Sequence, residues 1–266
     1  MVDDKDDDHF VDTGTALVEV LRSHGLQDGH AVLDLGSGYG RLAVGLLHDG
    51  FLGTYLGLDV LERPVVWCRR NLTPFTQGRL RFRHLDVRNG RYNPDGAMSP
   101  TDLRFPAKTG SHDYVAVFSV FTHMYEADIR RYLREIRRVL KPGGRAVTTW
   151  FLFDEARLPA VTSPESTAFP MVNEINAVTR YHEPRDPLWA ICYDADHARS
   201  MVEDAGLEVL TTAYGAWCGT AAATGQDVLV VGKPHARPSR GRGRLRRTLR
   251  GRWRGLRTAS AHGSRT

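Results

Sequence analysis

The stretch AVLDLGSGYGR at residues 31–41 constrains the fold of this chain more than any other feature. An apolar run leads into Asp34, a glycine-rich loop and an amphipathic segment that ends at Gly50. This order is typical of a buried strand, a tight turn and a helix. Such a unit opens a nucleotide-binding sheet, in which the glycines let a ligand lie against bare backbone. The sequence therefore predicts an α/β fold with a ligand site at this turn.

The spacing of the glycines distinguishes between two kinds of cofactor site. A dinucleotide fingerprint, G-x-G-x-x-G, would place its third glycine at position 41, which is an arginine here. The chain instead has Gly36, Gly38 and Gly40, with Asp34 two residues ahead of the first glycine and Ser37 between the first two. This D-x-G-x-G-x-G pattern resembles motif I of the class I S-adenosylmethionine (SAM) dependent methyltransferases. A carboxylate there would suit the ammonium and sulfonium charges of SAM, and a glycine turn without a ligand is the alternative.

Composition indicates one domain and a location inside the cell. The 266 residues are 41% hydrophobic, which is enough for one substantial core. No apolar run approaches the roughly 18 residues of a spanning helix, and no signal-peptide pattern follows Met1. The three cysteines, Cys68, Cys192 and Cys218, have no C-x-x-C spacing, so we expect buried, reduced thiols and no zinc site. These features favour a cytoplasmic protein.

Charge is divided unevenly along the chain. The net charge of the whole chain is +5. Residues 235–266 contain eleven arginines and no Lys, Asp or Glu, which gives +11, so residues 1–234 carry +5 minus +11, or −6. Closely spaced like charges at the acidic start repel one another, which is typical of disorder. We therefore expect three parts: a disordered acidic N-terminus at 1–12, one domain at 13–233 and an arginine-rich basic tail at 234–266.

The second predicted strand, residues 55–59, ends in an acid. Asp59 lies nineteen residues after Gly40 and is followed by Val60. An acid about 20 residues past the glycine loop is positioned to accept both hydroxyls of an adenosine ribose. The alternative role for Asp59 is an N-cap for a helix that starts near Leu61.

The other predicted elements follow from periodicity. Helical spacing recurs at 13–24, 126–140 and 194–205, and apolar runs predict strands at 80–85, 113–119, 145–153, 207–212 and 227–231. Five arginines lie along the 126–140 segment, which favours a solvated helix face over a nucleic-acid patch. The segment 88–111 is too long for a simple connection, and its Tyr92 and Asn93 favour an ordered loop at a ligand site.

The match to the class I SAM-dependent methyltransferases then extends over roughly residues 10–233. It rests on VLDLGSGYGR, GLDV, HLDVRN, YNPDG, DYVAVFSVFTHM, YLREIRRVLKPGGR and YGAWCG followed by QDVLVV, and YNP-x-G with SVFTHM resembles a bacterial branch. The resemblance implies a Rossmann-like three-layer α/β/α sandwich with a seven-stranded sheet of order 3-2-1-4-5-7-6 and strand 7 antiparallel. It also implies an acceptor-covering insert at about 154–192.

The resemblance further implies SAM as the cofactor, lying across the carboxyl ends of strands 1, 2 and 4. Asp86 stands where the family places an acid near the adenine amino group, and Val87 would add a backbone amide and an apolar face. Ser119 to His123 would face the methyl group. We expect the cofactor to be held by Asp34, Gly36, Ser37, Gly38, Gly40, Asp59, Val60, Asp86, Val87 and Ser119, with Tyr92, Asn93 and Trp217 on the substrate side.

Methyl transfer needs a base only where the nucleophile must lose a proton. His123 is the candidate for a hydroxyl acceptor, because it follows the fourth strand and imidazole titrates near neutrality. A helix-entry histidine bonded to backbone is the alternative, and His84, His182 and Tyr193 are weaker candidates. No metal-ligand spacing occurs near this strand, so we expect no metal.

The acceptor and the tail leave several functions open. The motif [N/D]-P-P-[Y/F], which holds a planar amide or amino group in amino-methyltransferases, does not follow the fourth strand. Its absence favours the hydroxyl of a small molecule or saccharide as the acceptor over RNA or protein. The tail spaces Leu245, Leu249, Trp253 and Leu256 on one helical face among arginines. This pattern suits an anionic membrane surface, with peripheral attachment at the inner membrane face, although nucleic acid or no partner are alternatives. A non-catalytic SAM-binding interaction protein is the third reading.

Overall fold

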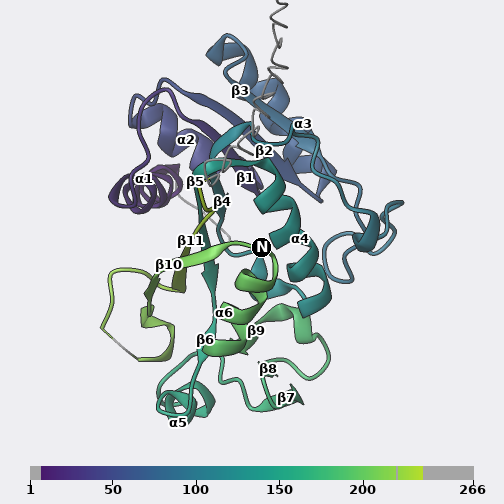
Figure 1. Cartoon of the computed structure of the whole chain (residues 1–266), viewed down its shortest axis with the longest axis vertical. Helices are drawn as coiled ribbons and strands as arrows, with labels where there is room; N and C mark the ends of the chain where they lie inside the picture. The colour runs from purple at the N-terminus through teal and green to yellow at the C-terminus, as the bar shows by residue number, and fades with distance from the viewer. Residues whose placement is uncertain (1–6, 220, 236–266) are drawn as a thin grey trace, which may run out of the picture. The chain divides into compact units, whose positions relative to one another are not determined.

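The computed structural model describes residues 7–219 and 221–235, and its centre is a seven-stranded sheet (Figure 1). Neighbouring strands follow the order β3-β2-β1-β4-β5-β11-β10. The strands are β1 (Ala31–Leu35), β2 (Thr54–Asp59), β3 (Leu80–His84), β4 (His112–Val117), β5 (Leu140–Trp150), β10 (Glu208–Ala213) and β11 (Asp227–Gly232). The first five are parallel, and β11 runs antiparallel to both of its neighbours.

This arrangement is the mixed α/β sheet that the sequence predicts, but the labels differ from the predicted order. Four further strands, β6 to β9, lie between β5 and β10 in the chain and form a sheet of their own. The strands predicted as sixth and seventh are therefore β10 and β11, and β11 is inserted between β5 and β10. The second sheet was not predicted from the sequence.

Helices cover both faces of the main sheet because successive strand residues point to opposite sides. Leu33, Leu35 and Val115 pack on one face with apolar residues of α4 (Glu126–Val139) and α6 (Ala195–Asp204). The other face carries Val32 and Ala116 against α1 (Asp7–Ser23), α2 (Arg41–His48) and α3 (Glu62–Asn71). The result is the three-layer sandwich that the sequence predicts.

Helix α1 begins earlier than expected. It starts at Asp7, so residues 7–12 are helical and do not belong to a disordered N-terminus as the sequence suggested. Its backbone lies close to α2, since a Cβ added to Gly45 would be 2.2 Å from the carbonyl oxygen of Gly14. The two glycines let α1 sit directly on α2.

The segment 154–192, expected as an acceptor-covering insert, contributes most of the second sheet, whose order is β6-β9-β8-β7. The strands of this sheet are β6 (Leu152–Phe153), which precedes the segment, β7 (Asn173–Asn176), β8 (Thr179–Tyr181) and β9 (Ile191–Asp194). The segment also contains the helix α5 (Leu158–Thr162). Five short 3-10 helices complete the described chain: η1 (Thr73–Thr76), η2 (Pro100–Asp102), η3 (Phe121–His123), η4 (Pro187–Trp189) and η5 (Ala216–Cys218). Aromatic and sulfur side chains, including Phe151 and Trp217, form a separate core beneath this sheet.

Two predictions concern the ends of the chain and its relation to membranes. The tail at 234–266 lies outside the described residues after His235, so the amphipathic helix proposed for it stays a prediction. Within the described part of the chain, no helix is both long enough and apolar enough to cross a membrane. The three cysteines are buried and form no disulfide, as expected.

Candidate functional site

The glycine loop after β1 has the backbone that only glycine adopts readily. Gly36, Gly38 and Gly40 have φ values of 76°, 49° and 83°. A Cβ on Gly36 would be 2.4 Å from the Val120 side chain, and one on Gly40 would be 2.8 Å from Leu72. A Cβ on Gly38 would meet nothing within 4 Å, so the loop leaves open space at its middle glycine.

Asp59 connects the ends of β1 and β2. One carboxylate oxygen accepts a hydrogen bond from the Gly38 amide at 2.7 Å, and the other accepts from the Leu61 amide at 2.8 Å. The second contact resembles the capping role considered for Asp59, while the first orders the glycine loop. Each carboxylate oxygen has two lone pairs, so both can still accept from a ligand hydroxyl.

Asp34 lies beneath the loop rather than at its surface. Its side chain is only 4% exposed and accepts a hydrogen bond from the Tyr55 hydroxyl of β2 at 2.5 Å. Burial raises the pKa of the Asp34 carboxyl to about 7, although the Tyr55 hydrogen bond opposes the shift. The sequence suggested that the Asp34 carboxylate would face the charges of a ligand. In the structure, this carboxyl is instead buried and bonded to Tyr55.

One polar atom of the loop has no partner. The Ser37 hydroxyl is buried and makes no hydrogen bond in the described structure. It sits against β2, because a Cβ on Gly57 would be 2.9 Å from the Ser37 oxygen. A buried hydroxyl without a partner costs free energy, which fits a place where a bound ligand completes the site.

The end of β3 brings together three of the predicted residues. The side-chain amide of Asn93 donates to the Asp86 carboxylate at 3.2 Å and to the Val87 carbonyl at 3.1 Å. The Val87 amide is already used, since it donates to Leu85 at 2.7 Å. Val87 is also buried in the core, so it does not offer the free amide that was expected.

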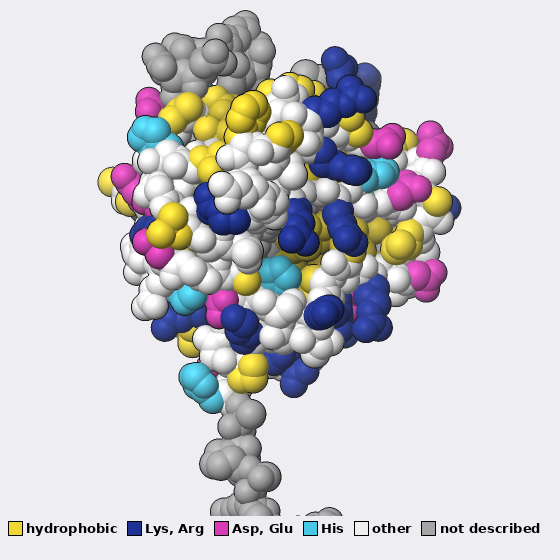
Figure 2. Space-filling view, turned by 90° about the horizontal axis from the view of Figure 1, so that it is seen from above, with side chains coloured by type: hydrophobic (Ala, Val, Ile, Leu, Met, Phe, Trp, Pro, Cys, Tyr) yellow, Lys and Arg dark blue, Asp and Glu magenta, His cyan; other side chains and the backbone are white. Residues whose placement is uncertain are grey.

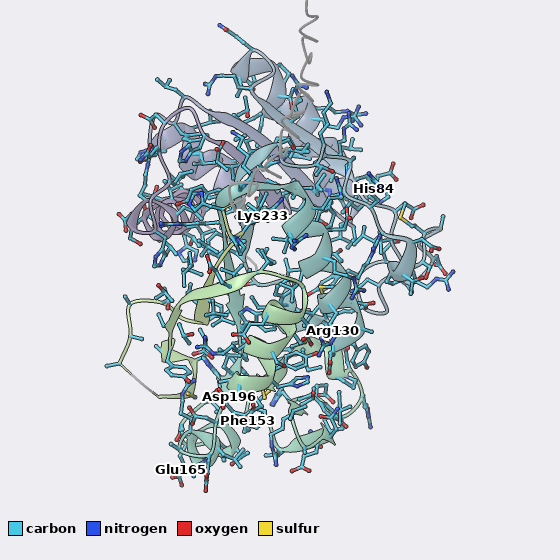
Figure 3. All side chains as sticks on the ribbon, in the orientation of Figure 1. His84, Arg130, Phe153, Glu165, Asp196 and Lys233 are labelled. Carbon is cyan, nitrogen blue, oxygen red and sulfur yellow. The ribbon has the colours of Figure 1, made fainter. Side chains whose placement is uncertain are left out.

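His84, labelled in Figure 3, fixes the neighbouring turn after β2. Its Nε2 lies 3.0 Å from the carbonyl oxygen of Val60. His84 thus ties β3 to the residue that follows Asp59, and this contact gives it a structural role in place of the base considered for it.

Ser119, two residues after the end of β4, has a strained conformation. Its φ of 54° places a non-glycine residue in the left-handed region, which is uncommon and concentrates at functional sites. The Ser119 amide donates to the Thr149 hydroxyl at 2.7 Å, and its hydroxyl donates to Gln226 at 3.0 Å. Contacts from β5 and from the residue before β11 therefore hold the turn.

His123 lies in η3 with its ring oriented by two neighbours. Its Nδ1 is 3.0 Å from the Leu188 carbonyl oxygen, and its ring meets Tyr92 edge to face at 5.8 Å. A carbonyl can only accept, so Nδ1 carries the proton and Nε2 of the neutral ring carries the lone pair. Burial lowers the pKa of His123. The ring is therefore neutral near pH 7.

The loop containing Tyr92 is joined to the second sheet. Arg91 pairs with Asp186, next to η4, and the Arg91 guanidinium lies over the Tyr92 ring at 5.4 Å. Tyr92, His123 and the residues of η4 therefore form one cluster, so the structure brings together two of the residues that the sequence placed near the substrate.

Trp217 differs from its predicted role. It is 8% exposed within the aromatic core, and its indole N–H donates to the Asp227 carboxylate at 2.8 Å. Asp227 is fully buried and also accepts from the amides of Leu152 and Gly215, with Arg157 at 3.3 Å. This carboxylate, which sequence reasoning missed, organises the junction of β6, β11 and the 214–218 loop, and Trp217 belongs to that junction.

The acids at the strand ends suit an organic ligand with groups that donate hydrogen bonds. Three carboxyl groups, those of Asp34, Asp59 and Asp86, lie at the carboxyl ends of β1, β2 and β3 or in the residues that follow. In the described part of the chain, no group of three or more His, Cys, Asp or Glu side chains could hold a metal ion. With the open space at Gly38, Asp59 and Asp86 fit an organic ligand that carries hydroxyl and amino groups, whereas Asp34 is buried beneath the loop.

Comparisons with known proteins agree with this geometry. A family described as a methyltransferase domain matches residues 33–148. A chain of the complex between the Haloferax volcanii Trm112 methyltransferase activator and the putative methyltransferase has 20% identity and a TM-score of 0.57, covering 86% of this chain and 94% of that one.

Two further structures show the same fold. The Burkholderia thailandensis 1,6-didemethyltoxoflavin-N1-methyltransferase, solved with S-adenosylhomocysteine (SAH), has 16% identity and a TM-score of 0.52, covering 86% of this chain and 80% of its own. A putative sarcosine dimethylglycine methyltransferase from Galdieria sulphuraria has 15% identity and a TM-score of 0.54, covering 84% and 85%. At these identities the likeness concerns the fold alone.

Proposed function

We propose that this chain, which carries a class I SAM-dependent methyltransferase domain, moves a methyl group from SAM to a hydroxyl of a small-molecule or saccharide acceptor. The enzyme class and the SAM cofactor rest on the matched methyltransferase domain and on the fold. The acceptor, its attacked atom and the residues that act on it are the proposed part. The single observation that carries the proposal is the position of His123, whose ring is held by the Leu188 carbonyl and by Tyr92 shortly after the end of β4.

The glycine loop and the acids of β2 and β3 would hold the cofactor. Asp59 would accept the ribose hydroxyls with the lone pairs that the backbone amides leave free, and Asp86 would meet the adenine amino group. Gly38 would allow close approach, and the Ser37 hydroxyl would gain the partner that it lacks. Asp34 would act from below, by holding Tyr55 and the loop rather than by contact with the cofactor.

SAM, when bound, supplies a methyl carbon that its sulfonium activates for in-line displacement. An acceptor hydroxyl would have to give up its proton to a base of the protein during the transfer. His123 Nε2 is the group we assign to this proton, because Nδ1 is committed to Leu188. General base catalysis of this kind contributes about 10²- to 10⁴-fold in rate.

Ser119 would position the methyl-transfer region. Its strained turn is held from β5 and from Gln226, so the end of β4 keeps one shape while the acceptor binds. The insert, through η4, would cover the acceptor side, since the Leu188 carbonyl directly orients His123. Both features favour orientation of the reactants as the main source of catalysis.

Calorimetry with SAH tests the cofactor half of this proposal. Asp59→Asn keeps the shape of the side chain but removes its charge, and we expect SAH affinity to fall by about 10- to 100-fold, the effect of a charge-assisted hydrogen bond to ligand. Glu155→Gln, in the exposed turn before α5, also removes one carboxylate charge; it serves as the control and should bind SAH like the wild type. Equal affinities for Asp59→Asn and the wild type would remove Asp59 from the site.

Transfer kinetics test the acceptor half. His123→Gln should retain SAH binding and lose about 10²-fold or more of its turnover. Should His123→Gln transfer methyl groups as fast as the wild type, the base would lie elsewhere or the acceptor would need none.

A further inference from the structure

Two adjoining hollows lie along β3, the edge strand of the main sheet, away from the glycine loop. The first is bordered by residues that begin β2, β3 and β4, and the second by the segment 104–109 and by Arg138 of α4. Both hollows include Arg83 and Pro106. They therefore form one groove between β3 and the chain segment that returns toward β4, which we call the β3 groove.

Every charged residue that lines the β3 groove is basic. The lining contains no Asp or Glu. Figure 2 shows Lys and Arg side chains gathered around a hollow on the face seen from above. The basic residues are Arg79, Arg81, Arg83, Arg104, Lys108 and Arg138.

The strand geometry explains half of this set. Leu80 and Phe82 of β3 are buried in the core, so the alternating arginines at 79, 81 and 83 project to the opposite side of the strand. Successive members are roughly 7 Å apart along the strand, from a rise of about 3.3 Å per residue. The segment 104–109 then adds two more cations across the groove.

Some of these cations are neutralised and others are not. Arg138 is paired with Glu135 at 2.6 Å, and Arg79 donates to the carbonyls of Phe51 and Gly53. The side chains of Arg83, Arg104 and Lys108 form no hydrogen bond or ion pair within the described residues.

The helix α4 provides a contrast on the same protein. Its Arg130 pairs with Glu126 and Asp204, and Arg137 donates to the Gly206 carbonyl. These arginines were expected to form a solvated helix face, yet several are held by intramolecular partners. Other described arginines, Arg134 of α4 among them, also have side chains without a partner, so the β3 groove differs in gathering three such cations along one lining that contains no acid.

Protection of an exposed strand edge is the structural alternative. Charged residues on an edge strand prevent strands of other chains from pairing with it. That function needs charges on the strand alone, whereas Arg104 and Lys108 add charge of the same sign from the facing segment. Like charges gathered without a counter-charge repel one another, and an anion in the groove would relieve that repulsion.

We propose that the β3 groove binds a strand of nucleic acid through its phosphates. Two adjoining hollows that share Arg83 and Pro106 offer more length than a single phosphate needs. A concave site also suits a strand better than a flat lipid surface does. The basic residues would supply contacts without sequence preference. The proposal concerns binding alone, so it stands whatever acceptor the methyl-transfer site uses.

The test compares two double variants of the full-length chain. In the first, Arg83→Gln and Arg104→Gln remove two unpartnered cations of the groove. In the second, Arg185→Gln and Arg199→Gln remove two exposed arginines that do not line it. The two variants have the same net charge and the same arginine-rich tail. Binding of a fluorescein-labelled oligouridylate strand is followed by anisotropy over a series of salt concentrations.

We expect the groove variant to lose about 10- to 30-fold in affinity near 0.1 M salt. The slope of log affinity against log salt concentration should also become smaller by about 1.4, because each phosphate contact on a single strand contributes about 0.7 to that slope. The control variant should stay within about twofold of the wild type. Equal losses in both variants would mean that only net charge matters, and no loss in either would mean that the groove is not used. Both results would overturn the proposal.

Two further binding measurements distinguish a nucleic acid strand from a lipid surface or a free phosphate compound as the ligand of the β3 groove. Vesicles of phosphatidylcholine with phosphatidylglycerol, and inorganic tripolyphosphate as a competitor, are tested with the same variants. If the groove variant lost binding to vesicles but not to the oligouridylate, a membrane surface would replace nucleic acid as the occupant. Unchanged thermal melting of both variants confirms that any loss reflects binding and not unfolding.

Discussion

The buried carboxyl of Asp34 makes the stability of this protein depend on pH in an unusual direction. Its pKa is about 7 in the folded protein, against about 3.9 in an unfolded chain. A carboxyl whose pKa is raised by folding contributes its full stability below the unfolded value and loses it as pH rises through the folded value. At about 1.4 kcal/mol per pH unit, the total loss is about 4 kcal/mol.

The substitution Asp34→Asn isolates this contribution. Asparagine keeps an oxygen that can accept from the Tyr55 hydroxyl, but it cannot ionise. Relative to the wild type, the free energy of unfolding of Asp34→Asn should therefore rise by about 3 kcal/mol between about pH 5 and about pH 8. Guanidinium chloride unfolding, followed by tryptophan fluorescence, measures the difference at each pH.

Asp113 provides the matched control. It pairs with Lys141 at 2.8 Å and accepts from the Ala31 amide, and its pKa is lowered. Both its folded and its unfolded pKa values lie below about 4, so Asp113→Asn should change stability by the same amount at both pH values. Parallel curves for Asp34→Asn and the wild type would refute the reasoning, because they would mean that burial does not hold the Asp34 proton.

Three other outcomes follow from particular contacts. Gly45→Ala should lower the free energy of unfolding by about 1–3 kcal/mol, because its Cβ would collide with the Gly14 carbonyl, while Gly225→Ala, in open space, should melt like the wild type. Arg157→Met should cost about 3–5 kcal/mol, because it leaves the fully buried Asp227 carboxylate without a counter-charge, and a melting temperature equal to that of the wild type would contradict this. The pH profile of kcat/KM should stay level from neutrality to below 6.5, because burial lowers the pKa of His123 and keeps the base form; a fall centred above 6.5 would be inconsistent with His123 as the base.

The main sheet could be predicted from sequence because its signals are local. The apolar runs of its strands, and the glycines between β1 and α2, fix the fold through residues that are neighbours in the chain. The same is true of Asp59, which is the last residue of β2. Strand ends and the acids that follow them meet at one edge of a parallel sheet, so their grouping needs no knowledge of side-chain contacts.

Features defined by distant contacts could not be predicted in this way. Strands β7 and β8 have four and three residues, too few for a periodic pattern to indicate a second sheet. The buried Asp227 begins an ordinary apolar strand, and its role depends on partners that the fold brings from elsewhere. The assignment of Trp217 to the substrate was made from its place in a loop, whereas Asp227 and the aromatic core determine where it lies.

The Val87 amide and the Asp34 carboxylate were misjudged for a related reason. Their positions follow motif spacing, but the availability of each group depends on whether the protein already occupies it. The Leu85 carbonyl takes the Val87 amide, and the Tyr55 hydroxyl meets the Asp34 carboxyl. Spacing predicts where a residue lies, and hydrogen bonding decides what it has left to offer.

The most direct test of the proposed methyl transfer is an incubation with methyl-labelled SAM and an extract of the source cells. Label is then counted separately in the small-molecule, glycan, lipid, RNA and protein fractions, with Asp59→Ala as the blank. We predict label above the blank in the small-molecule or glycan fraction, and its loss with His123→Gln. Label confined to the RNA or protein fraction would contradict the proposed acceptor. If every fraction matched the blank while the wild type still bound SAH, the proposed transfer itself would be contradicted.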